Sequence, residues 1–422
     1  MMKVNKTEFV IAGILLAAAL ILGATLLPSS LLFSRLITGL GIGYVLARGY
    51  FGFAGSANLA FRRGSTKLMR ALMLLVILAS FVSLFFSAVP ASDVNPDFVM
   101  KYNLFIHPVT MGTVIGGFMF GVGMAFASGC ASGLLTDLTL EFPKAVLGII
   151  FFGIGFLLSM PFGAKMPWIN TSLIKSSADT NGVWFPDLFN FDGLNGFLGA
   201  LILNIILAAI VIKLSYVYEA KRKAKGTYTP VDTEVEAEQA VGQLLDTNLS
   251  FYQRFFVRPW TLWESAIGMA IMYAAVLGLT KGAWGVSGAF PFWIAKLANL
   301  FGVSAEAIGN YTGNAKLVDP GIFQHQMSLQ GFAIALGAFI ALLSMGRLFA
   351  SFKAGLKIKG KQAIFAIIGG LLMGLSIGFG KGCNAGALFS PIVSFSLSGW
   401  IFLVFMVCGA YVGNRIMNLN KK

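Results

Sequence analysis

The sequence predicts an all-α polytopic membrane protein, with about ten transmembrane helices, additional re-entrant or broken helices and an inverted internal repeat. The first observation is composition, because 57% of the 422 residues are hydrophobic and only 11% are charged. A soluble domain typically carries about 25% charged residues. The second observation is a series of continuous apolar runs of about 20 residues, the length that crosses a bilayer core. The third is a glycine-rich segment with one cysteine, which occurs twice.

The apolar runs divide into spanning segments and shorter pieces. They are continuous rather than alternating, which argues against a β-barrel, and they lack the polar face of soluble helices. The predicted spans are 9–27, 31–49, 68–88, 108–128, 144–162, 193–216, 261–280, 325–346, 362–381 and 395–416. The shorter pieces, which are rich in Gly, Ser and Phe, are 50–60, 129–141, 283–298 and 382–394. We predict that these pieces are re-entrant or broken, with protein or a water-filled cavity covering their backbone.

Charge in the loops sets the predicted orientation. With the N-terminus in the cytoplasm, the inside loops carry most of the basic residues, and the outside loops hold only Lys101, Lys165, Lys175 and Lys316. This bias predicts a multi-pass protein with both termini in the cytoplasm. It also explains the formal charge of +14, so nucleic acid is not expected as a partner, whereas a lipid bilayer is.

A polar, charge-mixed stretch between Tyr216 and Pro259 separates two apolar halves. We predict an N-terminal repeat half at 1–216, which includes the leading transmembrane helix, a cytoplasmic linker at 217–260 and a C-terminal repeat half at 261–422. The linker is expected to be a flexible, solvated connector. The first apolar run is interpreted as a membrane helix rather than a cleaved signal, because no small-residue cleavage site follows it before Pro28.

The two cysteine segments align without gaps. "GGFMFGVGMAFASGCASGLL" begins at Gly116, "GGLLMGLSIGFGKGCNAGAL" begins at Gly369, and eight of the twenty positions are identical. A weaker match precedes each one, "RGYFGFAGS" from Arg48 and "KGAWGVSGA" from Lys281. The predicted topology runs the two copies in opposite directions through the membrane. Inverted repeats are typical of transporters, whose substrate site lies near the midplane where interrupted helices meet.

The repeated segments supply the candidate pathway residues. Glycines spaced by four place small residues along one face of a helix, which lets another helix approach closely. Tight packing explains most of that spacing, but it does not explain a cysteine at the same position in both copies. Cys408 has no counterpart and is interpreted as a small hydrophobe. The candidates are Cys130 and Cys383, their neighbours Gly129, Gly133, Gly382 and Gly386, and the adjacent Ser128, Lys381 and Asn384.

Basic residues at membrane depth are costly and usually functional. Arg48, Lys281 and Lys381 precede or enter glycine-rich breaks, which a base that reaches back to the interface would not require. These bases favour an anionic solute. A thiol is a weak S–H donor and a polarisable contact, which suits a solute that carries sulfur or selenium. No metal site or cofactor is predicted, and the absence of a nucleotide-binding motif argues against direct drive by ATP.

The paired Gly-Cys-x-x-Gly segments and the earlier base-Gly-aromatic-Gly segments resemble the YeeE/YedE family, also called the sulfur-transport domain family. The second half, through "WGVSGAFPFWIAKLANLFGV" and "GKGCNAGALFSPIVSFSLSGW", is most similar to the YedE branch. The resemblance implies an inner-membrane protein that moves thiosulfate or a related compound inward, with Cys130 and Cys383 passing the anion by S–H hydrogen bonds. Thiosulfate-transporting members carry a further cysteine where Gly52 stands here. Because the YedE branch is associated with selenium metabolism, a selenium compound is the alternative solute.

The sequence therefore predicts a transporter of the cell inner (plasma) membrane that imports a small sulfur-containing anion along a glycine-lined pathway with thiol contacts. A small cytoplasmic sulfur-carrier protein is expected as a partner. A membrane enzyme for thiol redox chemistry or sulfur transfer is the alternative from another class, and it requires paired or reactive cysteines.

Overall fold

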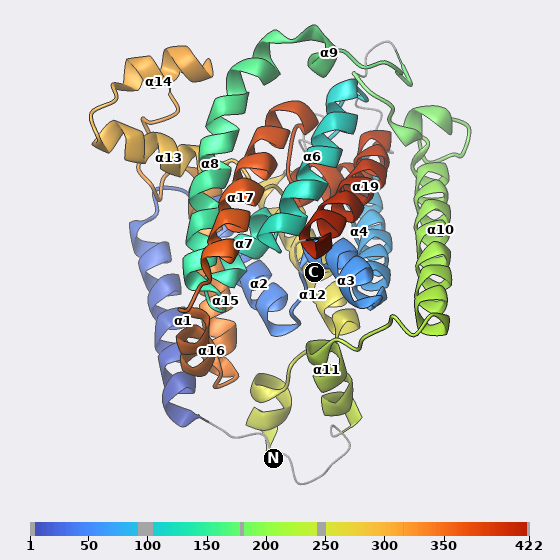
Figure 1. The fold of residues 1–422 in the computed structure, drawn as a ribbon. Coiled ribbons are helices and arrows are strands. Elements are labelled where there is room, and N and C mark those ends of the chain that lie inside the picture. Colours follow the sequence, from blue (N-terminus) through green and yellow to red (C-terminus); the bar gives the residue numbers. More distant parts are fainter. Residues whose placement is uncertain (1–4, 92–103, 178–180, 243–249, 315, 420–422) are drawn as a thin grey trace.

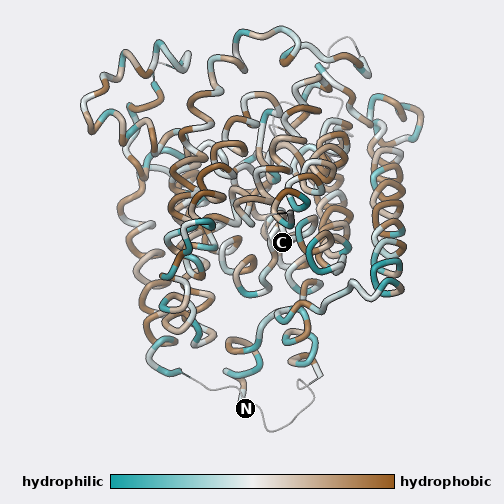
Figure 2. The backbone as a smooth tube through the Cα atoms, viewed as in Figure 1, coloured by the Kyte–Doolittle hydropathy of each residue, from teal (hydrophilic) through white to brown (hydrophobic). Residues whose placement is uncertain are grey.

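The computed structural model describes residues 5–91, 104–177, 181–242, 250–314 and 316–419 (Figure 1). Over these ranges the chain is a bundle of helices, and its only strand-like features are two isolated β-bridges. Ten of the described helical segments are long and apolar enough to cross a membrane. Figure 2 shows hydrophobic residues along these helices and hydrophilic residues in the linker. The prediction of an all-α polytopic membrane protein is confirmed.

The linker separates two runs of helices. The first run contains α1 (Lys6–Leu26), α2 (Ser30–Arg48), α3 (Phe53–Arg63), α4 (Lys67–Ala91), α6 (Met111–Ala127), α7 (Ala131–Asp137), α8 (Phe142–Lys165), α9 (Pro167–Asn170), η1 (Phe185–Leu188) and α10 (Phe197–Ala224). The linker contains α11 (Asp232–Gly242) and the π-turn η3 (Gln253–Val257). The second run contains α12 (Leu262–Thr280), α13 (Ala289–Leu300), α14 (Ala305–Thr312), α15 (Gln326–Ser344), α16 (Leu348–Gly355), α17 (Gly360–Gly380), the π-turn η4 (Asn384–Phe389), α18 (Ser390–Val393) and α19 (Leu397–Leu419). The four predicted short pieces correspond to α3, α7, α13 and the pair η4–α18.

Polar side chains cap the N-termini of long apolar helices at the points where the chain leaves a loop. Ser29 accepts a hydrogen bond from the backbone N–H of Leu32 at the start of α2. Thr261 and Glu264 form a reciprocal capping box at the start of α12. Such caps satisfy backbone donors that have no partner inside the helix and typically contribute about 1 kcal/mol each.

The helices α6 and α17 cross in opposite directions, and glycines make their contact close. A Cβ added to Gly116 would lie 2.5 Å from the backbone nitrogen of Gly380. A Cβ added to Gly369 would lie 2.6 Å from the backbone nitrogen of Ala127. Gly369 and Gly380 are the counterparts of Gly116 and Ala127 in the repeat, so each copy makes the same contact with the other. Such spacing is less than any real side chain tolerates, which explains why glycine stands at both positions.

The other helix pairs also join one repeat to the other, in the same reciprocal way. α8 packs against α17 and α6 packs against α19, while α2 pairs with α15 and α4 with α12. A Cβ on Gly121 would meet the carbonyl of Met406 at 2.1 Å, and a Cβ on Gly374 would meet the carbonyl of Phe152 at 2.1 Å. The two copies are therefore antiparallel and interlocked. The proposed boundaries at 216 and 260 stay a prediction.

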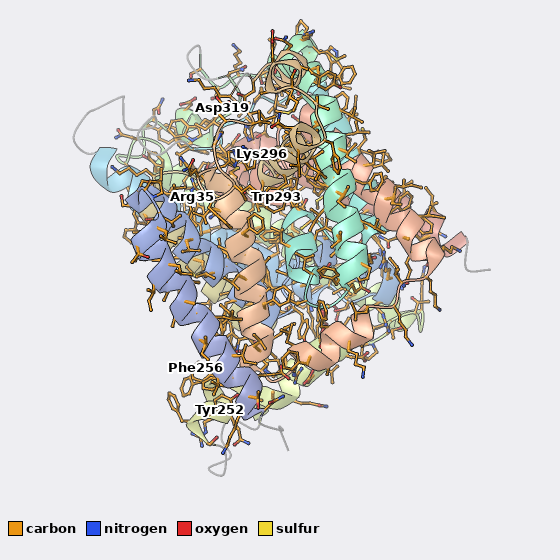
Figure 3. All side chains as sticks on the ribbon, turned by 90° about the vertical axis from the view of Figure 1, so that its left-hand side faces the viewer. Arg35, Tyr252, Phe256, Trp293, Lys296 and Asp319 are labelled. Atoms are coloured by element: carbon orange, nitrogen blue, oxygen red, sulfur yellow. The ribbon has the colours of Figure 1, made fainter. Side chains whose placement is uncertain are left out.

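Two helices stand at the edges of the bundle. Figure 1 shows α1 at one edge and α10 at the opposite edge. α10 packs mainly on α4, and α1 packs on α15 and α2. At the N-terminal end of α1, the Phe9 ring lies 4.4 Å from the Tyr252 ring and 5.4 Å from the Phe256 ring (Figure 3). The linker is therefore anchored beneath α1.

The expectation of a flexible, solvated linker is wrong for α11, which is an ordered helix that docks on the bundle. Its Glu234 accepts a hydrogen bond from Ser65 at 2.8 Å, and its Glu238 pairs with Lys67 at 2.6 Å. Glu236, between them, pairs with Arg347. The polar residues that suggested a solvated chain include carboxylates that bind bases on the bundle. Because these partners lie far apart in the sequence, the sequence alone did not reveal the pairs.

Candidate functional site

Each of the two cysteines follows a left-handed residue that ends a long helix. Ser128 ends α6 with φ 60°, and Lys381 ends α17 with φ 64°. After one glycine, Cys130 and Cys383 adopt extended backbone conformations with φ −109° and −88°, and each begins the next helical segment. A left-handed conformation costs a non-glycine residue about 1–2 kcal/mol. The same strained break in both copies indicates a feature that belongs to the site.

Both thiols lie inside the protein. Cys130 and Cys383 are each 1% exposed and belong to one core cluster. The sulfur of Cys130 lies 3.5 Å from the hydroxyl of Ser132. All three cysteines are free, and Cys408 is exposed on α19, away from this cluster. The structure therefore supplies two unpaired buried thiols at matched positions.

The predicted glycines surround these thiols closely. A Cβ on Gly382 would lie 2.7 Å from the backbone carbon of Gly386, and a Cβ on Gly129 would lie 3.1 Å from a carboxylate oxygen of Asp137. A Cβ on Gly133 would meet the Cys130 sulfur at 3.8 Å. A side chain at Gly382 would displace the break, one at Gly129 would press on the Asp137 carboxylate, and one at Gly133 would line the space beside the thiol.

A cavity of about 190 Å³ reaches Cys130. The connection between α2 and α3 forms one wall, α7 forms another, and Leu342 of α15 contributes to a third. A water molecule occupies about 30 Å³ of liquid, so the cavity has room for a small hydrated anion. Its lining includes the predicted Ser128, Gly129, Cys130 and Gly133, together with Tyr50 and Asp137, which the sequence analysis did not select.

The surroundings of Cys383 are covered by the segment that leads into α6. The Phe105 ring lies 3.7 Å from the position of a Cβ on Gly386 and 3.5 Å from one on Gly285. His107 Nε2 lies 3.2 Å from the carbonyl oxygen of Gly386. Burial lowers the pKa of His107 to about 4, so the ring is neutral at pH 7 and donates a hydrogen bond to that carbonyl. Sequence reasoning gave His107 no role, because its partner lies far along the chain.

Arg62 of α3 holds the end of α6, and the sequence analysis counted it only as a loop charge. Its guanidinium donates to the Ser128 hydroxyl at 3.1 Å, the Ala125 carbonyl at 2.6 Å and the Asn414 side-chain oxygen at 2.7 Å. A cation at a helix C-terminus is favourable, because the last carbonyls carry partial negative charge. Arg62 therefore positions the break that precedes Cys130. Its place in the sequence, directly before Arg63 and Gly64, gave no signal of this.

The three predicted bases do not converge on the thiols. Arg48 is fully buried, but it donates to the carbonyls of Phe255 and Arg258 and does not line the cavity. Lys281 ends α12 in a left-handed conformation and is exposed. Lys381 binds the Asn170 side chain and approaches the carbonyl of Gly163. Depth in the membrane was a poor guide to where these cations point.

Two buried polar atoms near Cys383 have no hydrogen-bond partner among the described residues. One is the side-chain oxygen of Asn384, whose nitrogen lies 3.7 Å from the sulfur of Met124. The other is the indole nitrogen of Trp284, whose ring packs 5.7 Å from Phe53 and 6.1 Å from Phe389. An unsatisfied buried group costs about 1–3 kcal/mol. Asn384 was predicted as a site residue, whereas Trp284 was not.

Comparisons with known proteins agree with this arrangement. A model of the sulphur-transport family matches residues 48–412. The chain is 31% identical over 170 residues to the probable transporter YedE of Escherichia coli (strain K12), a match that spans 39% of this chain and only 40% of that relative. It is 23% identical over 386 residues to the thiosulfate transporter TsuA of Spirochaeta thermophila, which covers 90% of this chain and 97% of that protein. It is also 23% identical over 396 residues to TsuA of Escherichia coli (strain K12), which covers 92% of this chain and 95% of that protein.

The family match includes both cysteine breaks, most of the lining of the cavity at Cys130, and the helix pairs α6–α17, α8–α17 and α4–α12. It agrees with the resemblance inferred from the motifs. Because the family model covers most of its length, this chain belongs to the sulphur-transport family.

Proposed function

We propose that this protein imports a small sulfur-containing anion, such as thiosulfate, across the inner membrane by a path that passes Cys130 and Cys383. The observation that carries the proposal is the pair of buried, unpaired thiols at matched breaks of two antiparallel helices, one of them reached by a cavity. The near full-length similarity to two thiosulfate transporters supports the choice of solute class.

The path uses weak contacts rather than a charged trap. A thiol donates a weak hydrogen bond. Arg48 and Lys381 are bound elsewhere and Lys281 is exposed at the end of α12, so none of the three predicted bases lines the cavity beside Cys130. Conduction requires binding that is favourable enough for entry and weak enough for release. Two thiols at matched breaks offer such contacts in succession, and the unpaired indole N–H of Trp284 offers a further donor on the Cys383 side.

The cavity at Cys130 is assigned to the cytoplasmic side. Leu342 lines it, and four residues later Gly346 approaches Asn5 at the start of α1, where a Cβ added to Gly346 would lie 3.0 Å from the Cβ of Asn5. If both termini lie in the cytoplasm, as the loop charges predict, this conformation is open inward and covered outward by Phe105 and His107. Entry of an anion from outside then requires the segment of Phe105 to move.

Two alternative functions compete with this proposal. The similarity to YedE over 170 residues and the glycine at position 52 favour a selenium compound as a competing solute. A thiol-redox or sulfur-transfer enzyme is less favoured, because reactive cysteines are usually partly exposed and electropositive, whereas Cys130 and Cys383 are each 1% exposed. A small cytoplasmic sulfur-carrier protein as the recipient stays a prediction.

The proposal is tested by uptake of radiolabelled thiosulfate in cells that lack their own importers. Cys130→Ala and Cys383→Ala each remove the thiol donor, and loss of one hydrogen bond of about 1–1.5 kcal/mol predicts an approximately tenfold fall in uptake. Cys408→Ala is the matched control, because this thiol is exposed on α19. Selenite and sulfite serve as competitors that rank the solutes. Normal uptake in both variants, at normal membrane expression, rejects the thiol pathway.

A further inference from the structure

The cavity that reaches Cys130 also contains a carboxylate that the pathway described above does not use. Asp137 is the last residue of α7 and lines this cavity. One of its carboxylate oxygens lies 3.1 Å from the position of a Cβ on Gly129, directly before the cysteine. Its backbone carbonyl accepts hydrogen bonds from Leu140 and Glu141. Its side-chain oxygens accept none from the described residues, so they face the cavity.

No base on the elements around α7 is dedicated to this carboxylate. Lys144 of α8 lies close enough to act electrostatically on Asp137, but it pairs with Glu141 at 2.5 Å. Arg62 of α3 binds Ser128, Ala125 and Asn414. Other charged or titratable groups on neighbouring elements also have partners elsewhere. Arg48 of α2 binds backbone carbonyls, Arg347 after α15 binds Glu236 and Tyr50 of the cavity wall, and Lys357 after α16 lies beside Glu141 in a separate hollow. Cys130 itself lines the cavity.

An ionised Asp137 and an oxyanion in one cavity of about 190 Å³ would repel each other with little water between them. A protonated Asp137 removes this repulsion and gains an O–H donor for the anion. The other repeat differs at this position, where Ser390 donates its hydroxyl to the Trp284 carbonyl at 2.6 Å. The titratable group is therefore confined to the Cys130 side.

We propose that Asp137 is the proton site of this transporter, and that an anion entering the Cys130 cavity takes up one proton there. The carboxylate gains a proton from solution when the anion binds, and it returns that proton when the anion leaves, so no other bond is made or broken. An anion that binds from outside and leaves to the cytoplasm therefore carries one proton inward with it, which couples import to a proton gradient. This inference depends on the proposed anion transport.

The test measures proton uptake with the full chain in lipid nanodiscs. Sodium thiosulfate is titrated by calorimetry at several pH values between 5.5 and 8, in buffers of different ionisation enthalpy. Thiosulfate stays a dianion over this range, so a proton taken up belongs to the protein. We expect about one proton per anion and an affinity that falls by up to about tenfold for each unit of rising pH. Asp137→Asn is expected to take up none and to bind with little dependence on pH.

Two further variants keep the test decisive. Asp137→Ser introduces the residue of the other repeat and is expected to behave like the Asn variant, which guards against a folding defect in either one. Glu141→Gln is the control, because this carboxylate pairs with Lys144, and proton uptake is expected to persist. If Asp137→Asn retains the proton uptake, or if the unmodified protein binds thiosulfate without any, the inference is overturned and the transport proposal stands. If no thiosulfate binds at any pH, the proposed function itself fails.

Discussion

The Cys130 and Cys383 breaks have the same backbone conformation at the end of the preceding helix, but different residues lie next to them. Both follow a left-handed residue and a glycine, and both present a buried thiol. At Cys130 the glycine faces a cavity and a carboxylate, whereas at Cys383 the neighbouring Gly386 is covered by Phe105 and His107. The repeat therefore supplies two equivalent buried thiols, and residues outside the repeated signature decide which of them a cavity reaches.

The reciprocal glycine contact between α6 and α17, which both repeats make, gives the prediction with the largest expected effect. Gly116→Ala and Gly369→Ala place a methyl group 2.5–2.6 Å from the opposing backbone, so each is expected to reduce stability, by about 1–3 kcal/mol for overpacking. Thermal unfolding followed by fluorescence-detected size exclusion measures the loss. The two variants should be equally affected, because the two contacts are counterparts.

Gly13→Ala is the matched control for these variants. Gly13 lies in α1, and a Cβ there would meet nothing within 4 Å. Replacing a helical glycine by alanine at an open position stabilises by up to about 1 kcal/mol. A loss of stability at Gly13 equal to that at Gly116, or a loss at only one of the two crossing glycines, would contradict the reciprocal packing.

The cavity at Cys130 and the cover of Phe105 and His107 near Cys383 predict that a reagent reaches the two thiols at different rates. In a Cys408→Ser background, a small membrane-permeable thiol reagent is expected to modify Cys130 through its cavity and Cys383 far more slowly. Phe105→Ala removes the ring 3.7 Å from the Gly386 Cβ position. It is expected to raise the Cys383 rate about tenfold, which corresponds to loss of a cover worth about 1.4 kcal/mol, and to leave the Cys130 rate unchanged. Mass spectrometry of the labelled peptides measures both rates. Equal rates in the unmodified protein would remove the distinction between an open and a covered side.

Much of the fold was predictable because a bilayer leaves few choices. A run of about 20 apolar residues must be a helix at membrane depth, since every backbone polar group needs a partner within the segment. Likewise, Cys130 and Cys383 stood out because a matched pair in opposed copies is more informative than a lone buried cysteine. Local sequence was sufficient for these inferences.

The partners of charged side chains were not predictable in the same way. Arg48 was predicted to face the pathway, yet its partners Phe255 and Arg258 lie more than 200 residues away in the linker. The local sequence marked Asp137 as an acid at membrane depth and Arg62 as a loop charge, but it did not give their roles. These come from the contact of Arg62 with Ser128 and from the cavity that Asp137 lines near Cys130. Hydropathy gives the depth of a charge in the membrane, but only tertiary packing gives its direction.

The smallest prediction concerns the cover over Cys383 and its response to acid. Burial lowers the pKa of His107 from 6.5 to about 4, so the unfolded chain binds a proton between these values and the folded chain does not. Stability rises with pH wherever the unfolded state holds more protons. The folded protein is therefore expected to lose stability at this site as pH falls from 6.5 to 4, with no contribution from His107 above 7.

His107→Gln isolates this effect, because the amide can donate to the Gly386 carbonyl and does not titrate. Other acidic and basic groups contribute equally to both proteins, so the difference in melting temperature between them is the quantity to measure. The difference should shift in favour of the Gln variant as pH falls from 6.5 to 4. The Cys383 labelling rate, compared between the two proteins at each pH, should rise only in the one that keeps His107. A difference that stays constant over this range would mean that folding does not lower the pKa of His107, and that the cover is not held by a buried, neutral imidazole.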